Sequence, residues 1–169
     1  PNEFLDNVKV ILKEEDIDNL VINRSTILFS GKSSLFSMAS MKKPKKIKSF
    51  SSDIIAMALN SSGSKIAVAL ADETVVILNS TTLKEVFTFK EKCITSMCFQ
   101  QDTLVYTTGS KKFSATQWQH DLLSNGSSGT VSANLLDGSK TKVILSALAW
   151  PTGLTLTEDA TFCISESWK

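Results

Sequence analysis

Histidine is almost absent from this sequence: His120 is the only one among 169 residues. A catalytic triad of serine, histidine and an acid, or a cysteine–histidine pair, would have to use that residue. It stands beside a polar stretch, and the chain contains no Gly-x-Ser-x-Gly motif of the kind that exposes a nucleophilic serine. We therefore expect His120 in a surface loop, and we find no support for nucleophilic catalysis.

Cysteine is also scarce, and its number is odd. Cys93, Cys98 and Cys163 leave at least one thiol unpaired. Cys93 and Cys98 are five residues apart. On one strand their side chains would point to opposite faces, because successive side chains alternate between the two faces. Two cysteines and one histidine do not make a zinc site. The first residues, PNEFLDNVKV, also do not resemble a signal peptide. We expect an intracellular, cytoplasmic or nuclear, location.

Long apolar runs and an excess of one charge are missing as well. No stretch reaches the roughly 18 apolar residues that cross a bilayer, and the net charge is +1. A general nucleic-acid or membrane binder would carry a broad basic excess. Gly31-Lys32-Ser33 has only the last letters of a phosphate-binding loop, without the glycine that should precede them. We expect neither nucleic acid nor membrane as a partner.

The chain is instead rich in short runs of β-branched and aromatic residues that end in turn residues. Between residues 54 and 90 four such runs follow one another, separated by polar connections. This pattern predicts an antiparallel meander of four strands. The runs are Ile54–Leu59, Ile66–Leu70, Val75–Leu78 and Val86–Phe89.

The meander recurs when the chain is shifted by about 40 residues, which is the period of propeller blades. Ile54 and Met57 fall on Ile94 and Met97, and Leu78 falls on Trp118. The repeat predicts an all-β fold, a β-propeller of four-stranded antiparallel blades. Further strands are expected at about 18–23, 26–30, 34–39 and 46–50 in the first unit, and at 94–100, 103–108 and 113–119 in the third.

One motif in these repeats resembles the WD-repeat family. Asp72-Glu73-Thr74-Val75-Val76-Ile77-Leu78-Asn79 is similar to its "DxTVxIWD" strand, with Leu78 in place of tryptophan and Asn79 in place of aspartate. Asn60-Ser61-Ser62-Gly63-Ser64-Lys65-Ile66 resembles its "SPDGxxLA" turn, whereas the family's Gly-His dipeptide is missing. The resemblance covers about residues 16–120. It implies a divergent propeller, held by apolar packing, that binds proteins or peptides.

The end of the chain follows a different pattern. Residues 143–168 resemble the blades of strictosidine-synthase-like propellers, whose motif reads "vLxxLxfPNGvalspDxtfxxvxEs". This resemblance places strands at 131–136 and 142–146 in one blade and at 153–157 and 161–166 in the next. A further WD-type unit beginning at Val131 is the alternative.

The second resemblance also implies a possible activity. Related calcium-dependent esterases and lactonases bind the metal through asparagine and glutamate at the inner ends of strands. In this chain Thr152 replaces the asparagine, and Glu166 matches the glutamate. A hydroxyl is a poor substitute for an amide oxygen on calcium. We expect no cofactor, with calcium at Glu166 as the alternative.

Two further groups of residues have both a structural and a functional interpretation. The run from residue 42 to 48 holds five lysines, which suit either an exposed outer strand that resists aggregation or a nuclear-import patch. Trp118, Trp150 and Trp168 suit either packing between blades or a ligand cage. We favour the structural interpretation in both cases.

Together these patterns predict about four blades, with an incomplete ring that belongs to a longer protein. Residues 1–124 form the WD-like segment, and 125–169 the strictosidine-synthase-like one. The expected function is a non-enzymatic interaction scaffold, and the alternative is a hydrolase or its degenerate relative. We expect a protein or peptide ligand as the partner, and an oligomer or another chain segment that completes the ring. Exposed charged loops supply the candidate binding residues: Lys42, Lys43, Lys45, Lys46, Asp72, Glu73, Lys111 and Lys112.

Overall fold

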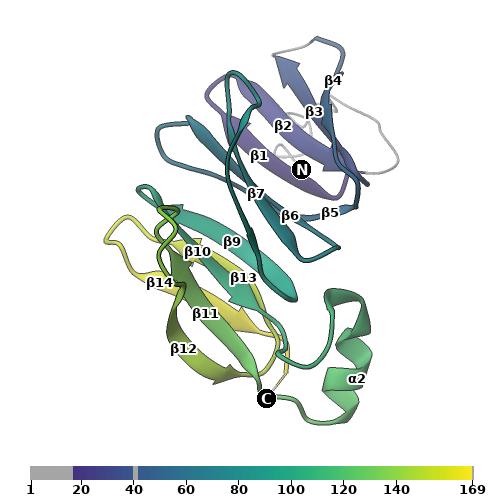
Figure 1. The fold of residues 1–169 in the computed structure, drawn as a ribbon, viewed down its shortest axis with the longest axis vertical. Coiled ribbons are helices and arrows are strands. Elements are labelled where there is room, and N and C mark those ends of the chain that lie inside the picture. The colour runs from purple at the N-terminus through teal and green to yellow at the C-terminus, as the bar shows by residue number, and fades with distance from the viewer. Residues whose placement is uncertain (1–16, 40–41, 169) are drawn as a thin grey trace, which may run out of the picture.

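The computed structural model describes residues 17–39 and 42–168, and they form three four-stranded antiparallel sheets and one two-stranded hairpin (Figure 1). In every sheet the strands stand in chain order, so each connection joins direct neighbours. The first sheet holds β1 (Asn19–Asn23), β2 (Thr26–Gly31), β3 (Ser34–Ala39) and β4 (Lys45–Ser49). The second holds β5 (Ile54–Leu59), β6 (Lys65–Leu70), β7 (Thr74–Asn79) and β8 (Glu85–Lys90). All the strands expected in these two units are confirmed.

The third sheet corrects one prediction. Its strands are β9 (Ile94–Gln100), β10 (Thr103–Thr108), β11 (Gly129–Asn134) and β12 (Lys142–Leu148). The strand expected at 113–119 is wrong, because these residues lie in a connection that contains η1 (Ala115–Gln117) and α2 (Trp118–Leu123). Ser114 and Gln117 form a capping box that starts the helical turn, which satisfies main-chain donors that a strand would have paired.

The last described strands are β13 (Pro151–Leu156) and β14 (Phe162–Glu166), which pair as a hairpin. The placement of strands implied by the strictosidine-synthase-like pattern is therefore confirmed. A WD-type unit beginning at Val131 is wrong, since Val131 lies within β11, the third strand of its sheet. The third sheet takes β9 and β10 from before residue 125, and β11 and β12 from after it.

The sheets pack face to face, and each interface is apolar. Leu35, Ile66 and Leu78 are buried between the first and second sheets. Ile77 and Leu104 belong to the cluster between the second and third sheets. A smaller cluster, which contains Val105, Val131 and Leu154, joins the third sheet to the hairpin. Such mutual burial is what a thin sheet needs, because one sheet alone cannot cover its own apolar side chains.

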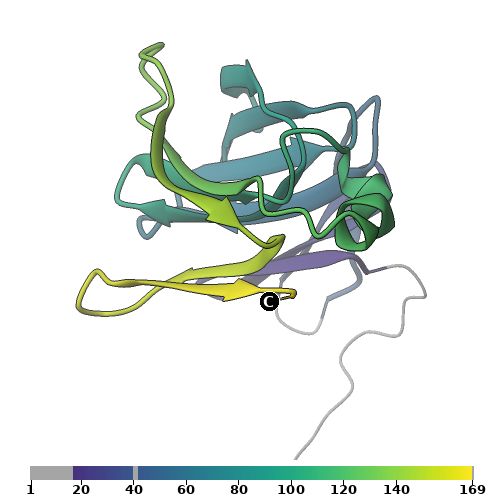
Figure 2. The same cartoon turned by 90° about the horizontal axis from the view of Figure 1, so that it is seen from below.

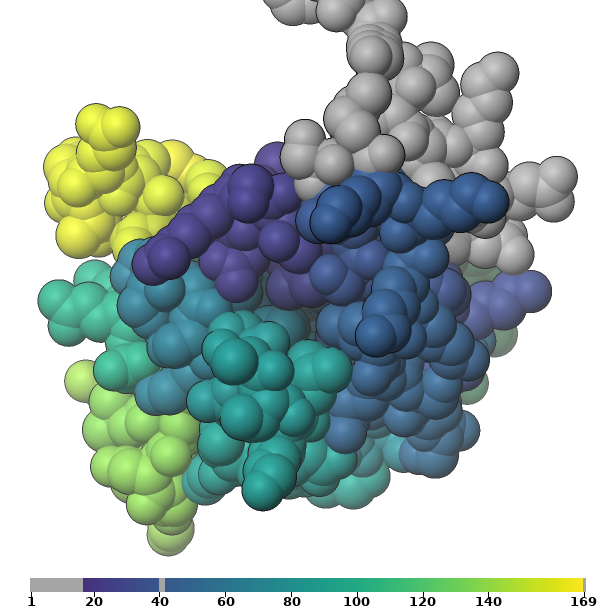
Figure 3. Space-filling view, turned by 90° about the horizontal axis from the view of Figure 1, so that it is seen from above, coloured from purple at the N-terminus to yellow at the C-terminus, as the bar shows by residue number. Residues whose placement is uncertain are grey.

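The innermost strands contact one another in chain order, β1 with β5, β5 with β9 and β9 with β13, as expected for propeller blades. Side chains join neighbouring blades here: Asn19 Nδ2 donates to Ile54 O at 3.3 Å, and Thr95 Oγ1 donates to Pro151 O. Figure 2 shows the hairpin of β13 and β14 (yellow) along one side of the molecule. Over the described residues the ring is not closed. Figure 3 shows β1 (purple) at the surface, and its Leu20 and Ile22 are 53% and 64% exposed.

Within the described part of the chain, no helix is long and apolar enough to span a membrane.

Candidate functional site

The eight charged residues predicted to bind a partner lie at two opposite ends of the blades. Because neighbouring strands are antiparallel, all connections from second to third strands lie at one end. We call this the insert end, since the connection 109–128 with η1 and α2 is there. Connections from first to second and from third to fourth strands lie at the other end, the pocket end. Asp72, Glu73, Lys111 and Lys112 belong to the insert end, Lys42 and Lys43 to the pocket end, and Lys45 and Lys46 to β4.

All eight side chains are exposed. Because they lie at different ends of the blades and on β4, the structure does not bring them together into one surface. Asp72 has a local structural role: its Oδ1 accepts a hydrogen bond of 3.0 Å from the Thr74 main chain. Hydrogen bonds from Thr74 lower the pKa of the Asp72 carboxyl. Glu73 takes the left-handed position of the same turn, with φ of 69°. Their role in binding stays a prediction.

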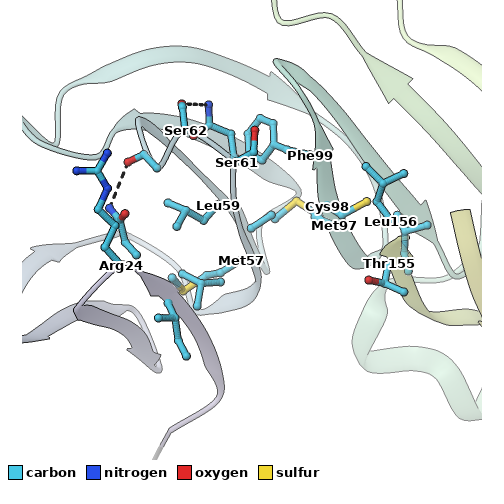
Figure 4. Close-up of a pocket in the computed structure, with 17 residues that line it drawn as sticks. Arg24, Met57, Leu59, Ser61, Ser62, Met97, Cys98, Phe99, Thr155 and Leu156 are labelled. Atoms are coloured by element: carbon cyan, nitrogen blue, oxygen red, sulfur yellow. Dashed lines mark hydrogen bonds between the residues drawn. The ribbon is translucent and has the colours of Figure 1, made fainter. Parts of the chain in front are cut away.

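A cavity that sequence reasoning missed opens at the pocket end, where β1, β5, β9 and β13 terminate (Figure 4). Its volume is about 690 Å³. In Figure 4, Leu59, Met57 and Met97 lie between Arg24 on one side and Thr155 and Leu156 on the other. Met57 and Met97 are 9% and 7% exposed, so they are well packed behind a surface to which polar groups contribute more than apolar ones.

The rim of this cavity is built mainly by one turn between β5 and β6. Asn60 is 4% exposed, and its Oδ1 accepts hydrogen bonds of 2.9 Å from the main-chain nitrogens of both Ser64 and Lys65. Asn23 Nδ2 donates to Gly63 O at 3.2 Å, which ties the turn to the neighbouring blade. The rim is therefore fixed by buried hydrogen bonds.

The cavity lining is not suited to acid–base or nucleophilic chemistry. Among the described residues that line it, Arg24 is the only charged one. Cys98 is the only thiol in the lining, and burial raises its pKa to about 11, which keeps it protonated at neutral pH. Two methionines with adaptable side chains instead suit contact with apolar groups of varied shape.

The residues expected to hold calcium in the alternative interpretation do not fit a metal. Glu166 Oε1 accepts a hydrogen bond of 2.6 Å from the Ala149 main chain, so this carboxylate fastens the end of the hairpin. The Thr152 hydroxyl contacts Ser167 Oγ at 3.3 Å. Among the residues that the structure describes, no group of three or more His, Cys, Asp or Glu side chains could coordinate an ion. Calcium binding needs more oxygen ligands than Glu166 supplies.

At the insert end all three tryptophans gather. Trp150 and Trp168 stack with ring centroids 5.8 Å apart. Trp150 is 5% exposed and covers Gly109, where a Cβ atom would come within 2.8 Å of the indole. Trp150 is thus a packing residue, as expected, whereas Trp118 is 43% exposed.

Comparison with known proteins agrees with both resemblances. The family model of strictosidine synthase matches residues 96–168, which is less than half of the chain. No curated protein matches the sequence.

Two solved structures share the fold. "Crystal structure of RRP9 WD40 repeats" matches with a TM-score of 0.57 and 16% identity, over 79% of this chain and 40% of that one. "Structure of U3-55K" matches with a TM-score of 0.61 and 14% identity, over 94% of this chain and 54% of that one. The chain therefore has the fold of a WD40-type β-propeller and spans about half the length of the structures it matches.

Proposed function

We propose that this chain is a non-enzymatic β-propeller scaffold that binds a protein or peptide segment in the cavity at the pocket end. The cavity at the ends of the inner strands, where Arg24 is the only charged residue in the described lining, is the observation that carries the proposal. Concave sites that combine apolar walls with a few polar groups that orient a ligand are typical binding sites. The near-neutral chain, at +1, favours a protein over a nucleic acid as partner. The same balance favours a protein without membrane attachment, and the three free cysteines favour a reducing, intracellular compartment.

The open ring is a second surface for assembly. Leu20 and Ile22 of β1 are exposed on it, and apolar groups in that position favour contact with another blade. We propose that a further chain segment or a second copy completes the ring.

Selection of linear peptides from a displayed library tests the cavity. A selected peptide is synthesised, and its Kd is measured for the chain and for Thr155→Arg, which places a long charged side chain at the exposed rim. We expect the Kd to rise at least tenfold for this variant. Thr116→Arg, on η1 at the insert end, is the matched control and should leave the Kd unchanged. Equal binding by both variants would place the site elsewhere, and a library without binders would contradict the scaffold.

The alternative is a hydrolase related to strictosidine synthase, favoured by the family match over residues 96–168. Thermal unfolding with calcium and with EDTA separates the two functions, because an ion that binds only the folded state raises Tm. The scaffold predicts equal Tm values in both buffers. A rise of several degrees that EDTA reverses, together with hydrolysis of an aryl ester, would favour the enzyme.

A further inference from the structure

The connection 109–128 departs from the repeat that builds the rest of the molecule. The equivalent connections in the first and second sheets consist of residues 32–33 and 71–73 only. Here the chain instead forms η1 and α2 before it returns as β11 (Figure 1). Connections in a β-scaffold tolerate such insertions, and they often carry binding residues.

A buried carboxylate fixes this insert to the blade. Asp121, in α2, is 2% exposed, and its Oδ1 accepts a hydrogen bond of 2.8 Å from Ser110 Oγ. The Asp121 carbonyl accepts a further bond of 2.8 Å from the Gly126 main chain. A Cβ atom at position 126 would lie 2.2 Å from Asp121 Oδ2, so only glycine fits there. The helix is therefore held in one position, and the only negative charge of the insert is hidden from solvent.

This fixed helix completes an apolar pocket of about 460 Å³, which we call the tryptophan pocket. Trp118 and Leu122 stand four residues apart and so project from the same face of α2. They are 43% and 37% exposed, which leaves them accessible to a partner. The pocket is lined by Trp118, Leu122, Trp150, Thr152, Ser167 and Trp168.

The walls of the pocket are rigid. Trp168 Nε1 donates to Gly126 O at 3.4 Å, which links the far wall to the insert. Trp150 is held between Gly109 and the Trp168 ring. Rigid indole walls lose little conformational entropy on binding, and buried aromatic anchors contribute most of the affinity at protein interfaces.

The exposed charges of the insert itself, residues 109–128, are positive. Lys111 and Lys112 are exposed, and Lys92 Nζ donates to Lys112 O at 2.9 Å from the next connection. Lys112 Nζ also lies 5.0 Å from the Phe113 ring centroid. Because Asp121 is buried, Lys111 and Lys112 are the charged side chains of the insert that a partner can contact directly. A partner with negative charge is therefore favoured.

We propose that the tryptophan pocket binds an aromatic or large aliphatic side chain of a peptide segment whose neighbouring residues are Asp or Glu. The anchor stacks on the indole walls, and the acidic neighbours pair with Lys111 and Lys112. This site is separate from the cavity at the pocket end, and it would stand even if nothing binds there.

Tryptophan fluorescence reports directly on such binding, because all three tryptophans of the chain line this pocket. The probe is the peptide Glu-Asp-Phe-Asp-Glu with blocked termini, which contains no tryptophan. We expect a saturable change in tryptophan fluorescence, and a Kd that rises with salt. An alanine in place of the phenylalanine should raise the Kd at least tenfold, and lysines in place of the acidic residues should do the same.

Variants of the chain give the complementary test. Trp118→Ala should raise the Kd at least tenfold, and Lys111→Glu with Lys112→Glu should reverse the preference between acidic and basic peptides. Both changes are at exposed side chains, so circular dichroism should match that of the original chain. Thr155→Arg, at the pocket end, is the control and should bind the probe normally, which separates this site from the proposed scaffold cavity.

Three results would overturn the proposal. One is a fluorescence change that does not saturate. Another is equal binding of acidic and basic peptides, which would leave an apolar pocket without charge preference. The third is tighter binding of a proline-rich or trimethyl-lysine peptide, which would assign the pocket to a different class of partner.

Discussion

The three cysteines occupy three different environments. Burial raises the pKa of Cys98 to about 11 and also raises that of Cys93, whereas Cys163 is exposed on β14. Only the thiolate is a nucleophile, so a raised pKa lowers reactivity at neutral pH. We expect iodoacetamide at pH 7.5 to label Cys163 first, as measured by mass spectrometry of the digested protein.

The pH dependence distinguishes a raised pKa from simple shielding. The thiolate fraction of Cys98 rises at every pH below its pKa of about 11 but is still small at pH 9, so its labelling should keep accelerating up to about pH 11. Cys163→Ser should remove the fast phase. Labelling of Cys98 as fast as that of Cys163 at pH 7.5 would show that the thiol is less buried than described.

Among the turns, the one between β5 and β6 depends on a single side chain. Asn60→Ala would leave the main-chain donors of Ser64 and Lys65 without the acceptor that each now has at 2.9 Å. Ser64 is exposed and Lys65 half-buried, so water can replace part of what is lost, and each hydrogen bond contributes about 1 kcal/mol. We expect the free energy of unfolding to fall by about 1–2 kcal/mol, measured by urea denaturation.

Asn60→Asp is the matched control for this turn. Aspartate keeps an acceptor for both main-chain donors, and the hydroxyls of Ser62 and Ser64 can donate to its second oxygen. Its loss of stability should be clearly smaller than that of Asn60→Ala. Equal losses would mean that the amide donor, rather than the acceptor, holds the turn.

Strands with a regular repeat were predictable, and the insert was not. β5 to β8 combine β-branched runs with turn residues, which are local signals. Applying the same shift of about 40 residues to the third unit predicted a strand that ends near Trp118. The prediction failed because the chain departs from the repeat after β10. The Ser114 and Gln117 capping box was the local signal that could have corrected it.

The cavity and the tryptophan pocket could not have been predicted by the same means. Arg24, Met57 and Thr155 meet only because the inner strands of four sheets end at one place. Trp118, Trp150 and Trp168 likewise come from three separate segments. Both sites are formed by the three-dimensional packing of segments that are distant in the sequence, and the periodicity of the sequence does not encode that packing.

At the scale of the whole molecule, β12 is the most exposed apolar strand. Val143, Ile144 and Leu145 are 53%, 45% and 46% exposed. An apolar strand at the edge of a sheet favours association between molecules. Ile144→Lys should lower light scattering and dye binding at high protein concentration. Its effect on the free energy of unfolding should stay within about 0.5 kcal/mol, as for most surface changes.

Val86→Lys on β8 is the control for this prediction. Val86 is 55% exposed but stands beside Glu85, and the aromatic residues that follow it, Phe87 and Phe89, are half-buried rather than exposed. Its replacement should change scattering little. Equal effects of the two variants would indicate that added charge, rather than the loss of an apolar edge, reduces association.

Among the described residues, the extensive contacts between blades, such as those of β1 with β5, β5 with β9 and β9 with β13, join direct neighbours. Links such as Asn23 to Gly63, Lys65 to Asp102 and Thr95 to Pro151 all join direct neighbours. In such an array, disorder spreads from one unit to the next, and it begins where a unit has a neighbour on one side only. The two-stranded hairpin is such a terminal unit. Its amides should exchange with deuterium before those of β5 to β8. On heating, the chain should unfold in stages, so that different spectroscopic probes report different midpoint temperatures.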